Sequence, residues 1–338
     1  MQIEYFCIAI RFSVGGCGST TWYQARMNRE RHRAILPFLL ACAFAILLAV
    51  KYLQPQILVV IAGLDLFRGY LEALALLPVL LAALFWARMR WPLFMVGLVL
   101  CVDLVVPVAS DYDANLTPTK GPTLRVITYN WLWDNQERDS IYPWLARQSA
   151  DIVAIQEFSE EDRDAAEKLY ALFPYHTRPA PDLVILSRHR IVQEETRLVE
   201  DHAIVRAVLD VEGRRLAVWG VHPSTLRSVS ELAARNYYLT TLASMVSRAR
   251  EPSVMLGDFN ATQWDPYFAR VKRRGQLHEE PHLLPPPTRI GVRSGLAFVG
   301  APIDHVLTSR LNVLSNCQTG PALGSDHLPL ICDLTLRD

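Results

Sequence analysis

Three short strings in the last third of the chain place metal- or phosphate-binding side chains beside apolar, strand-like runs. They are GDFN at 257–260, IDHV at 303–306 and SDHLPL at 325–330. A carboxylate or imidazole at a strand end stands on a rigid element, where packing limits its rotamers. The three strings together indicate a catalytic site at the rim of a sheet.

Three strand-like runs further upstream end in side chains of the same kind. Asn130 follows the run 124–128, Glu157 follows 151–155, and His222 follows 216–221. One such residue would carry little weight, because polar residues commonly end strands. Six strand-like runs in succession that carry such side chains favour a shared site.

The carboxylates in this set suit a hard divalent cation. Mg²⁺ prefers oxygen ligands in octahedral geometry and keeps several waters, so one or two carboxylates suffice. Glu157 is the first candidate ligand, although a lone glutamate at a strand end would be interpreted as a solvent-exposed residue.

Asp258 and Asn260 stand two residues apart, which places both on one face of an extended segment. In this interpretation Asp258 aligns and deprotonates an attacking water, and Asn260 holds that water or the phosphoryl oxygens. The alternative is an Asx-turn after the strand, with Gly257 supplying the bend. The turn and the chemistry are compatible.

Asp304 and His327 are predicted to form an acid–imidazole pair. A carboxylate bound to one ring nitrogen sets the tautomer and favours the imidazolium, which can stabilise charge on a transferring phosphoryl group. Asp326 either ligates the metal or positions His327. His305 follows Asp304 directly, so we expect it on the opposite face of the strand.

The order of these residues resembles the endonuclease/exonuclease/phosphatase superfamily, which includes deoxyribonuclease I, over roughly residues 122–336. The resemblance implies phosphate-ester hydrolysis with a divalent metal, Mg²⁺ in most members and Mn²⁺ as the alternative. It also implies a four-layer α-β-β-α sandwich of two mixed sheets.

The resemblance adds three residue roles. Asn130 looks like the partner of Glu157 at the metal, and His222 looks like a second imidazole that contacts phosphate. Arg206, in the stretch AIVR, resembles a phosphate-contacting strand of deoxyribonuclease I. A strand arginine without that resemblance is usually a solvated or edge residue.

The pattern after residue 121 alternates between short apolar strands and helical stretches, which indicates an α/β protein. The expected strands are 125–129, 152–155, 183–186, 204–211, 216–221 and 254–256. The expected helices include 141–147, 162–172 and 228–250.

Composition divides the chain, because most of the excess in its 51% hydrophobic residues lies before residue 110. The runs 34–50, 70–87 and 91–109 are each long enough to cross a bilayer as a helix, although any one of them could be a buried core helix. We therefore expect a segment 1–33, a membrane region 34–109 with about three spans, a linker 110–121 and a catalytic domain 122–338.

Basic residues near the span ends predict the orientation. Four arginines precede the first span, and Arg88 and Arg90 lie between the second and third. Both places are expected in the cytoplasm, so a multi-pass protein would carry its catalytic domain on the extracytoplasmic side. Met27 begins a basic segment that leads into the first span, which favours an initiation site there and leaves residues 1–26 as an extension.

The six cysteines form no metal-binding spacing. Cys317 and Cys332 are the two in the predicted catalytic domain, and the sequence is compatible with a disulfide or with two buried thiols.

Charge bears on the substrate. From residue 120 onward 25 basic residues face 27 acidic ones, whereas nucleic-acid-binding proteins generally display a basic face. Two phosphodiester substrates remain open: a lipid headgroup, favoured by the membrane tether, and extracytoplasmic nucleic acid. A non-catalytic membrane-bound binding module is the alternative outside this class, and no protein partner can be inferred.

Overall fold

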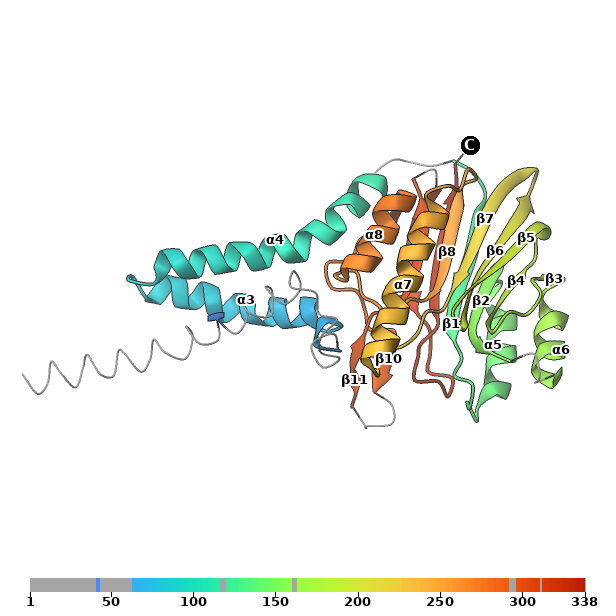
Figure 1. The fold of residues 1–338 in the computed structure, drawn as a ribbon, viewed down its shortest axis with the longest axis horizontal. Coiled ribbons are helices and arrows are strands. Elements are labelled where there is room, and N and C mark those ends of the chain that lie inside the picture. Colours follow the sequence, from blue (N-terminus) through green and yellow to red (C-terminus); the bar gives the residue numbers. More distant parts are fainter. Residues whose placement is uncertain are drawn as a thin grey trace, which may run out of the picture.

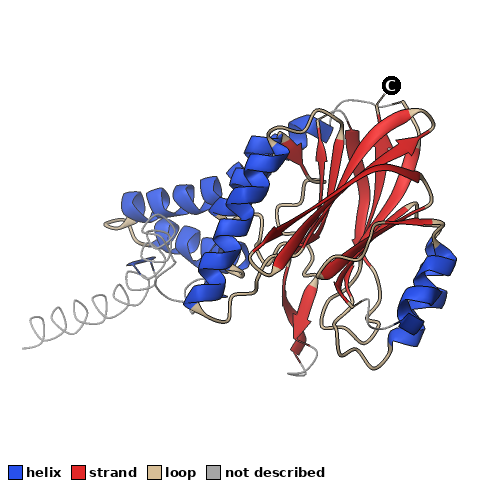
Figure 2. Cartoon of the chain, turned by 45° about the vertical axis from the view of Figure 1, so that its right-hand side comes forward, coloured by secondary structure: helices blue, strands red, loops and turns tan. Residues whose placement is uncertain are grey.

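The computed structural model of the chain describes residues 41–42, 63–115, 120–159, 163–291, 296–310 and 312–337. Two six-stranded sheets pack face to face, and helices cover the outer side of each (Figures 1 and 2). Each sheet contains one parallel strand pair among antiparallel ones. The architecture is therefore the α/β sandwich of two mixed sheets that the sequence predicts.

The first sheet has the strand order β13-β14-β1-β2-β4-β3. Its strands are β1 (Thr123–Asn130), β2 (Ile152–Phe158), β3 (Tyr175–His176), β4 (Asp182–Ser187), β13 (Asn312–Thr319) and β14 (Leu330–Leu336). The parallel strands β1 and β2 are joined through η2 (Arg138–Ser140) and α5 (Ile141–Gln148), and α6 (Arg163–Leu172) follows β2.

The second sheet has the order β5-β6-β7-β8-β12-β9. Its strands are β5 (Arg190–Val199), β6 (His202–Val211), β7 (Arg214–Val221), β8 (Ser253–Asp258), β9 (Leu277–His278) and β12 (Asp304–Ser309). Helix α7 (Val229–Val246) joins the parallel strands β7 and β8, and α8 (Pro266–Gly275) follows β8. A separate hairpin pairs β10 (Arg289–Gly291) with β11 (Leu296–Ala301).

Alternation along the strands produces three apolar layers. Val126 and Val254 belong to the core between the sheets. Ile127 packs with the α5 and α6 side, and Met255 with the α7 and α8 side. Because both faces of each central strand are buried, those strands read as largely apolar runs, and most of their polar residues lie near the ends.

Within residues 63–115, the longest described stretch before the sandwich, lie the long helices α3 (Arg68–Phe85) and α4 (Arg90–Asn115). Both are long and apolar enough to cross a membrane by length and composition, which is weak support for membrane association. Large apolar side chains on them are exposed, among them Leu74, Leu84, Phe85 and Trp91. The predicted first span, 34–50, lies outside the described residues except at 41–42, as does the segment 1–33.

The helical pair packs directly against the sandwich on the α8 side (Figure 1). The Tyr70 ring meets the Trp264 ring edge-on at 5.8 Å, and the Tyr70 hydroxyl donates to the Pro285 carbonyl. In α4, Asp111 accepts from Lys272 Nζ at 2.6 Å. Helices α3 and α4 are thus joined to the sandwich by aromatic and polar contacts.

Cys317 in β13 and Cys332 in β14 form a disulfide across two neighbouring strands. The sequence is compatible with a disulfide or with two buried thiols, and the structure has the disulfide.

Candidate active site

A cleft of about 530 Å³ opens where the carboxyl ends of the parallel strands in both sheets meet. Seven of the nine sequence-predicted site residues line it: Asn130, Glu157, His222, Asp258, Asn260, Asp326 and His327. Asp304 lies directly behind His327. The ninth residue, Arg206, is elsewhere.

Glu157 reaches the cleft because of a β-bulge. The register between β2 and β4 shifts between Gln156 and Phe158, and Glu157 has φ 57°, in the left-handed region. A bulge of this kind re-aims one side chain out of the regular alternation. The Glu157 carboxylate accepts from the Trp133 backbone N at 2.9 Å and from Asn130 Nδ2 at 3.0 Å.

Asn130 connects the two sheets at the floor of the cleft. Its Nδ2 donates both to Glu157 Oε1 and, at 3.2 Å, to Asp258 Oδ2. The carboxylates of Glu157 in the first sheet and Asp258 in the second sheet therefore converge on the Asn130 amide. These carboxylates supply the oxygen ligands that a hard cation such as Mg²⁺ prefers.

Asp258 lies at the centre of the site and is 2% exposed. Its Oδ1 accepts from the Asn260 backbone N at 2.8 Å, and its Oδ2 is 3.6 Å from His327 Nε2 and 3.9 Å from His222 Nε2. Burial raises the pKa of Asp258, and the nearby Asp304 carboxylate adds to this, against the opposing effect of the two imidazoles. A carboxylate with a raised pKa is a better proton acceptor.

The glycine of the GDFN string allows this placement. A Cβ on Gly257 would lie 2.0 Å from the Val221 carbonyl oxygen of the neighbouring strand. Only glycine permits the two strands to approach so closely just before their functional ends.

Asn260 is not in an extended segment with Asp258, as the two-residue spacing suggested. Its φ of 47° turns the chain after β8, and the bond from its backbone N to Asp258 closes an Asx-turn. One N–H of its amide donates to the Pro223 carbonyl at 3.0 Å. Asn260 thus orients Asp258 and anchors the segment after His222, while still lining the cleft.

Asp304 and His327 form a buried pair, with Asp304 Oδ2 2.8 Å from His327 Nδ1. Antiparallel pairing of β12 with β8 places Asp304 directly opposite Asp258. Burial disfavours a charged ring at His327, but Asp304 and Asp258 outweigh it and raise the pKa of His327 to about 9. The ring is therefore an imidazolium at neutral pH, with Nε2 towards the cleft.

His305 lies on the other side of β12, as strand alternation predicts. Its Nδ1 is 2.7 Å from Glu279 Oε1, and its ring packs at 4.2 Å from that of Phe268 in α8.

His222 and Asp326 also line the cleft. The His222 backbone N donates to the Tyr238 hydroxyl at 3.2 Å, which ties the end of β7 to α7. Asp326 lies at the rim, where its Oδ2 is 3.4 Å from Arg289 Nη2. Its carboxylate therefore offers charge at the rim rather than in the buried centre.

The structure does not bring Arg206 to the cleft. Its guanidinium pairs with Glu251 at 2.7 Å and lies over the Trp219 ring. The neighbouring-strand partner of Arg206 is Trp219, which faces α7. Resemblance of a stretch such as AIVR does not determine which side of the strand an arginine occupies.

Several cleft residues had no clear signal in the sequence. His202, Arg227 and Arg289 all line the opening. His202 begins β6, and its position just before an apolar run was the one available signal. Arg289 comes from the short strand β10 after a proline-rich loop, where no periodic pattern exists.

A sequence model of the Endonuclease/Exonuclease/phosphatase family matches residues 127–327. A search of curated protein sequences gave no match.

Three solved structures are similar in fold. The endonuclease/exonuclease/phosphatase from Beutenbergia cavernae has a TM-score of 0.52 at 18% identity, covering 64% of this chain and 72% of its own. A humanized TDP2 of D. rerio has 0.53 at 14% identity, covering 63% and 99%. Sphingomyelinase C from Streptomyces griseocarneus has 0.49 at 18% identity, covering 63% and 99%. The first two of these, at their low identities, show the fold alone.

Proposed function

The chain belongs to the endonuclease/exonuclease/phosphatase family, and on this basis we propose that it is a membrane-anchored, divalent-metal-dependent phosphoesterase. The observation that carries the proposal is the single cleft that collects Glu157, Asp258 and the Asp304–His327 pair from both sheets. A non-catalytic binding module would not need a buried carboxylate between two imidazoles.

Glu157 and Asn130 are the residues that would hold the cation, with Asp326 contributing charge from the rim. When bound, Mg²⁺ or Mn²⁺ would neutralise charge on the phosphoryl oxygens. Asn130 directs Nδ2 at both carboxylates, so it would ligate the cation through Oδ1 only after its amide rotated.

The other side chains have roles that follow from their protonation. Asp258, with its raised pKa, would take the proton from an attacking water. His327, held as an imidazolium by Asp304, would donate from Nε2 to a phosphoryl oxygen. His222 would contact phosphate from the opposite side.

We propose that the chain is anchored through α3 and α4 as part of a multi-pass membrane region, with the catalytic domain, residues 122–338, outside the cytoplasm. The exposed apolar faces of both helices support the anchoring. The Cys317–Cys332 disulfide supports the location, since disulfides persist in oxidising compartments.

A second cavity supports contact of the sandwich with a lipid surface, and for that reason we favour lipid headgroups over nucleic acid as the substrate class. It measures about 630 Å³ and lies between α4 and α8, with Arg270, Arg273 and Arg310 beside the apolar Val106. Val106 is 64% exposed and lies in the apolar stretch of α4. Cations next to a membrane-type helix suit the headgroup level of a bilayer with anionic lipids.

The test is an assay of the full chain in detergent or in lipid nanodiscs, because removal of α3 would uncover Trp264. Phospholipid phosphodiesters, single- and double-stranded DNA, RNA and phosphate monoesters are compared with Mg²⁺, with Mn²⁺ and with EDTA. We expect metal-dependent release from a phospholipid. Cleavage of nucleic acid alone would support the nuclease alternative, and no hydrolysis of any substrate would support the binding module.

A further inference from the structure

We propose that Asp182, His202 and His222 form a second cation site in the same cleft, which takes a transition-metal ion such as Zn²⁺ rather than Mg²⁺. The inference rests on the arrangement of these three side chains and not on the proposed hydrolysis.

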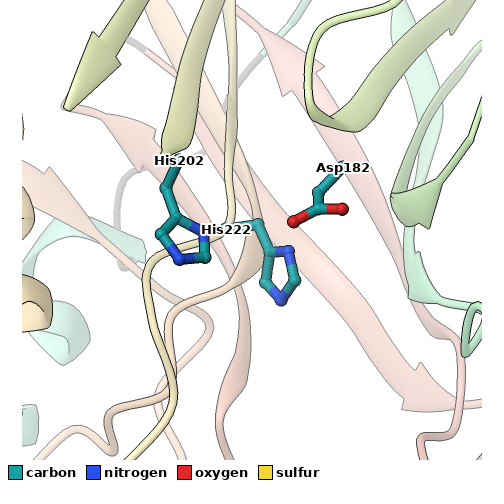
Figure 3. A group of neighbouring side chains, drawn as sticks. All are labelled: Asp182, His202 and His222. Atoms are coloured by element: carbon teal, nitrogen blue, oxygen red, sulfur yellow. The ribbon is translucent and has the colours of Figure 1, made fainter. Parts of the chain in front are cut away.

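The three residues come from different elements and meet at one point. Asp182 begins β4 in the first sheet, His202 begins β6, and His222 follows β7 in the second sheet. One ligand atom from each lies within 4.8 Å of the other two. Figure 3 shows the His222 ring between His202 and the Asp182 carboxylate.

Local backbone geometry keeps Asp182 in this position. Its φ is 62°, and it stands opposite Phe158, just past the bulge that re-aims Glu157. A left-handed conformation is uncommon for residues other than glycine and tends to occur at functional sites. Two left-handed residues at the same end of the β2–β4 pair, Glu157 and Asp182, therefore both line the cleft.

The imidazole nitrogens give an independent indication. Nδ1 of His202 and Nδ1 of His222 are both buried and have no hydrogen-bond partner among the described residues. His222 is 6% exposed, so its ring is more than nine-tenths buried. Buried polar atoms are nearly always paired, and unpaired ones in a native structure point to an ion or water.

The type of donor selects the cation. Two imidazoles and one carboxylate are a common ligand set for catalytic Zn²⁺ and leave a fourth position open, here towards the cleft. The Glu157 and Asp258 carboxylates, which converge at Asn130, suit Mg²⁺ instead. Asp258 Oδ2, 3.9 Å from His222 Nε2, adds negative charge near the proposed cation.

A simpler arrangement would have Asp182 orient His222 without any metal. That arrangement needs only Asp182 and His222 and gives His202 no role. The His202 ring nevertheless lies perpendicular to the His222 ring, with centroids 5.9 Å apart. His202 therefore separates the two interpretations.

The experiment measures metal binding directly. The full chain in detergent is stripped of metal and titrated with Zn²⁺ in millimolar Mg²⁺, against a competing indicator dye. Co²⁺ in place of Zn²⁺ gives a second readout in its visible absorption. The variants are His202→Ala and Asp182→Asn. Controls are His189→Ala, which alters a histidine outside the cleft, and Glu157→Gln, which alters the Mg²⁺-type group.

We expect one Zn²⁺ per chain, with affinity reduced at least tenfold in His202→Ala and Asp182→Asn but unchanged in both controls. Unchanged affinity in His202→Ala would overturn the site, as would loss of Zn²⁺ binding in Glu157→Gln. Thermal unfolding of each variant separates loss of the site from loss of the fold. Mg²⁺-supported hydrolysis without any Zn²⁺ binding would remove the second site and leave the proposed function standing.

Discussion

Asp304 Oδ2 lies 2.8 Å from His327 Nδ1, and both side chains are almost wholly buried. Asp304 begins β12, which pairs with β8, and His327 comes from the segment that precedes β14. The carboxylate thereby sets the imidazole tautomer and leaves Nε2 directed at Asp258, 3.6 Å away.

This pairing predicts that Asp304 acts through His327 and not as a metal ligand. A misoriented imidazole and an absent one fail alike, so Asp304→Asn, His327→Ala and the double variant should each lose about 10²–10⁴-fold in turnover. Turnover at saturating Mg²⁺ on the best substrate would be compared in a double-mutant cycle. Additive losses would indicate independent roles. Rescue of Asp304→Asn by extra metal would make Asp304 a ligand, as its grouping with Asp258 and His327 would allow.

Glu157 is predicted to be essential to metal-dependent turnover. Glu157→Ala removes a carboxylate from the cation group, so we expect activity to fall by orders of magnitude with little change in thermal stability. Glu195→Ala, an exposed glutamate of β5, is the matched control and should retain activity. EDTA should abolish wild-type activity and Mg²⁺ should restore it. Full hydrolysis in excess EDTA would rule out the metal assignment.

The sequence predicted the location of the site because strand ends carry a strong signal. Asn130 and Glu157 end a parallel pair in one sheet, and His222 and Asp258 end a parallel pair in the other. Carboxyl ends of parallel strands share an edge, and uninterrupted apolar runs make those ends visible. The core strands were predictable for the same reason.

What the sequence could not predict depends on tertiary contacts. The Glu157 side chain points into the cleft because of a β-bulge. A bulge is defined by the pairing of β2 with β4, so it cannot be recognised in the sequence of β2 alone. Strand β5 was not predicted, because it is an edge strand with mostly exposed polar residues and no alternation. Arg206 was assigned to phosphate by likeness, but its side of β6 is determined by pairing with β7.

His278 predicts a loss of stability in mild acid. Burial, together with Lys272 and Arg310, lowers the pKa of His278 from 6.5 to about 4. In the unfolded chain His278 binds a proton below about pH 6.5, whereas in the folded chain it binds one only below about pH 4. The free energy of unfolding therefore falls as pH drops from about 6.5 to about 4. Between pH 7.5 and pH 5 we expect a loss of roughly 2 kcal/mol from this group.

The measurement is thermal unfolding of the full chain in detergent at both pH values, followed by near-ultraviolet circular dichroism. His278→Phe removes the titrating group, so its melting temperature should fall by about 4–8 °C less than that of the wild type over the same pH change. His189→Phe is the control for loss of a histidine elsewhere. Equal acid sensitivity in wild type and His278→Phe would contradict the prediction.

The last prediction concerns the side of the membrane on which the sandwich lies. Arg88 lies between α3 and α4, Arg90 is the first residue of α4, and basic residues at span ends are retained in the cytoplasm. The chain that leaves α4 towards the sandwich should then emerge on the opposite side. A reporter that is active only outside the cytoplasm, fused after Asp113, should be active, and the same reporter fused after Arg88 should be silent. A cytoplasm-requiring reporter should give the reverse pattern. If both fusions report the cytoplasm, α3 and α4 form a hairpin that does not span, and the exposed apolar residues of α3 and α4 would instead lie on a membrane surface or against another protein.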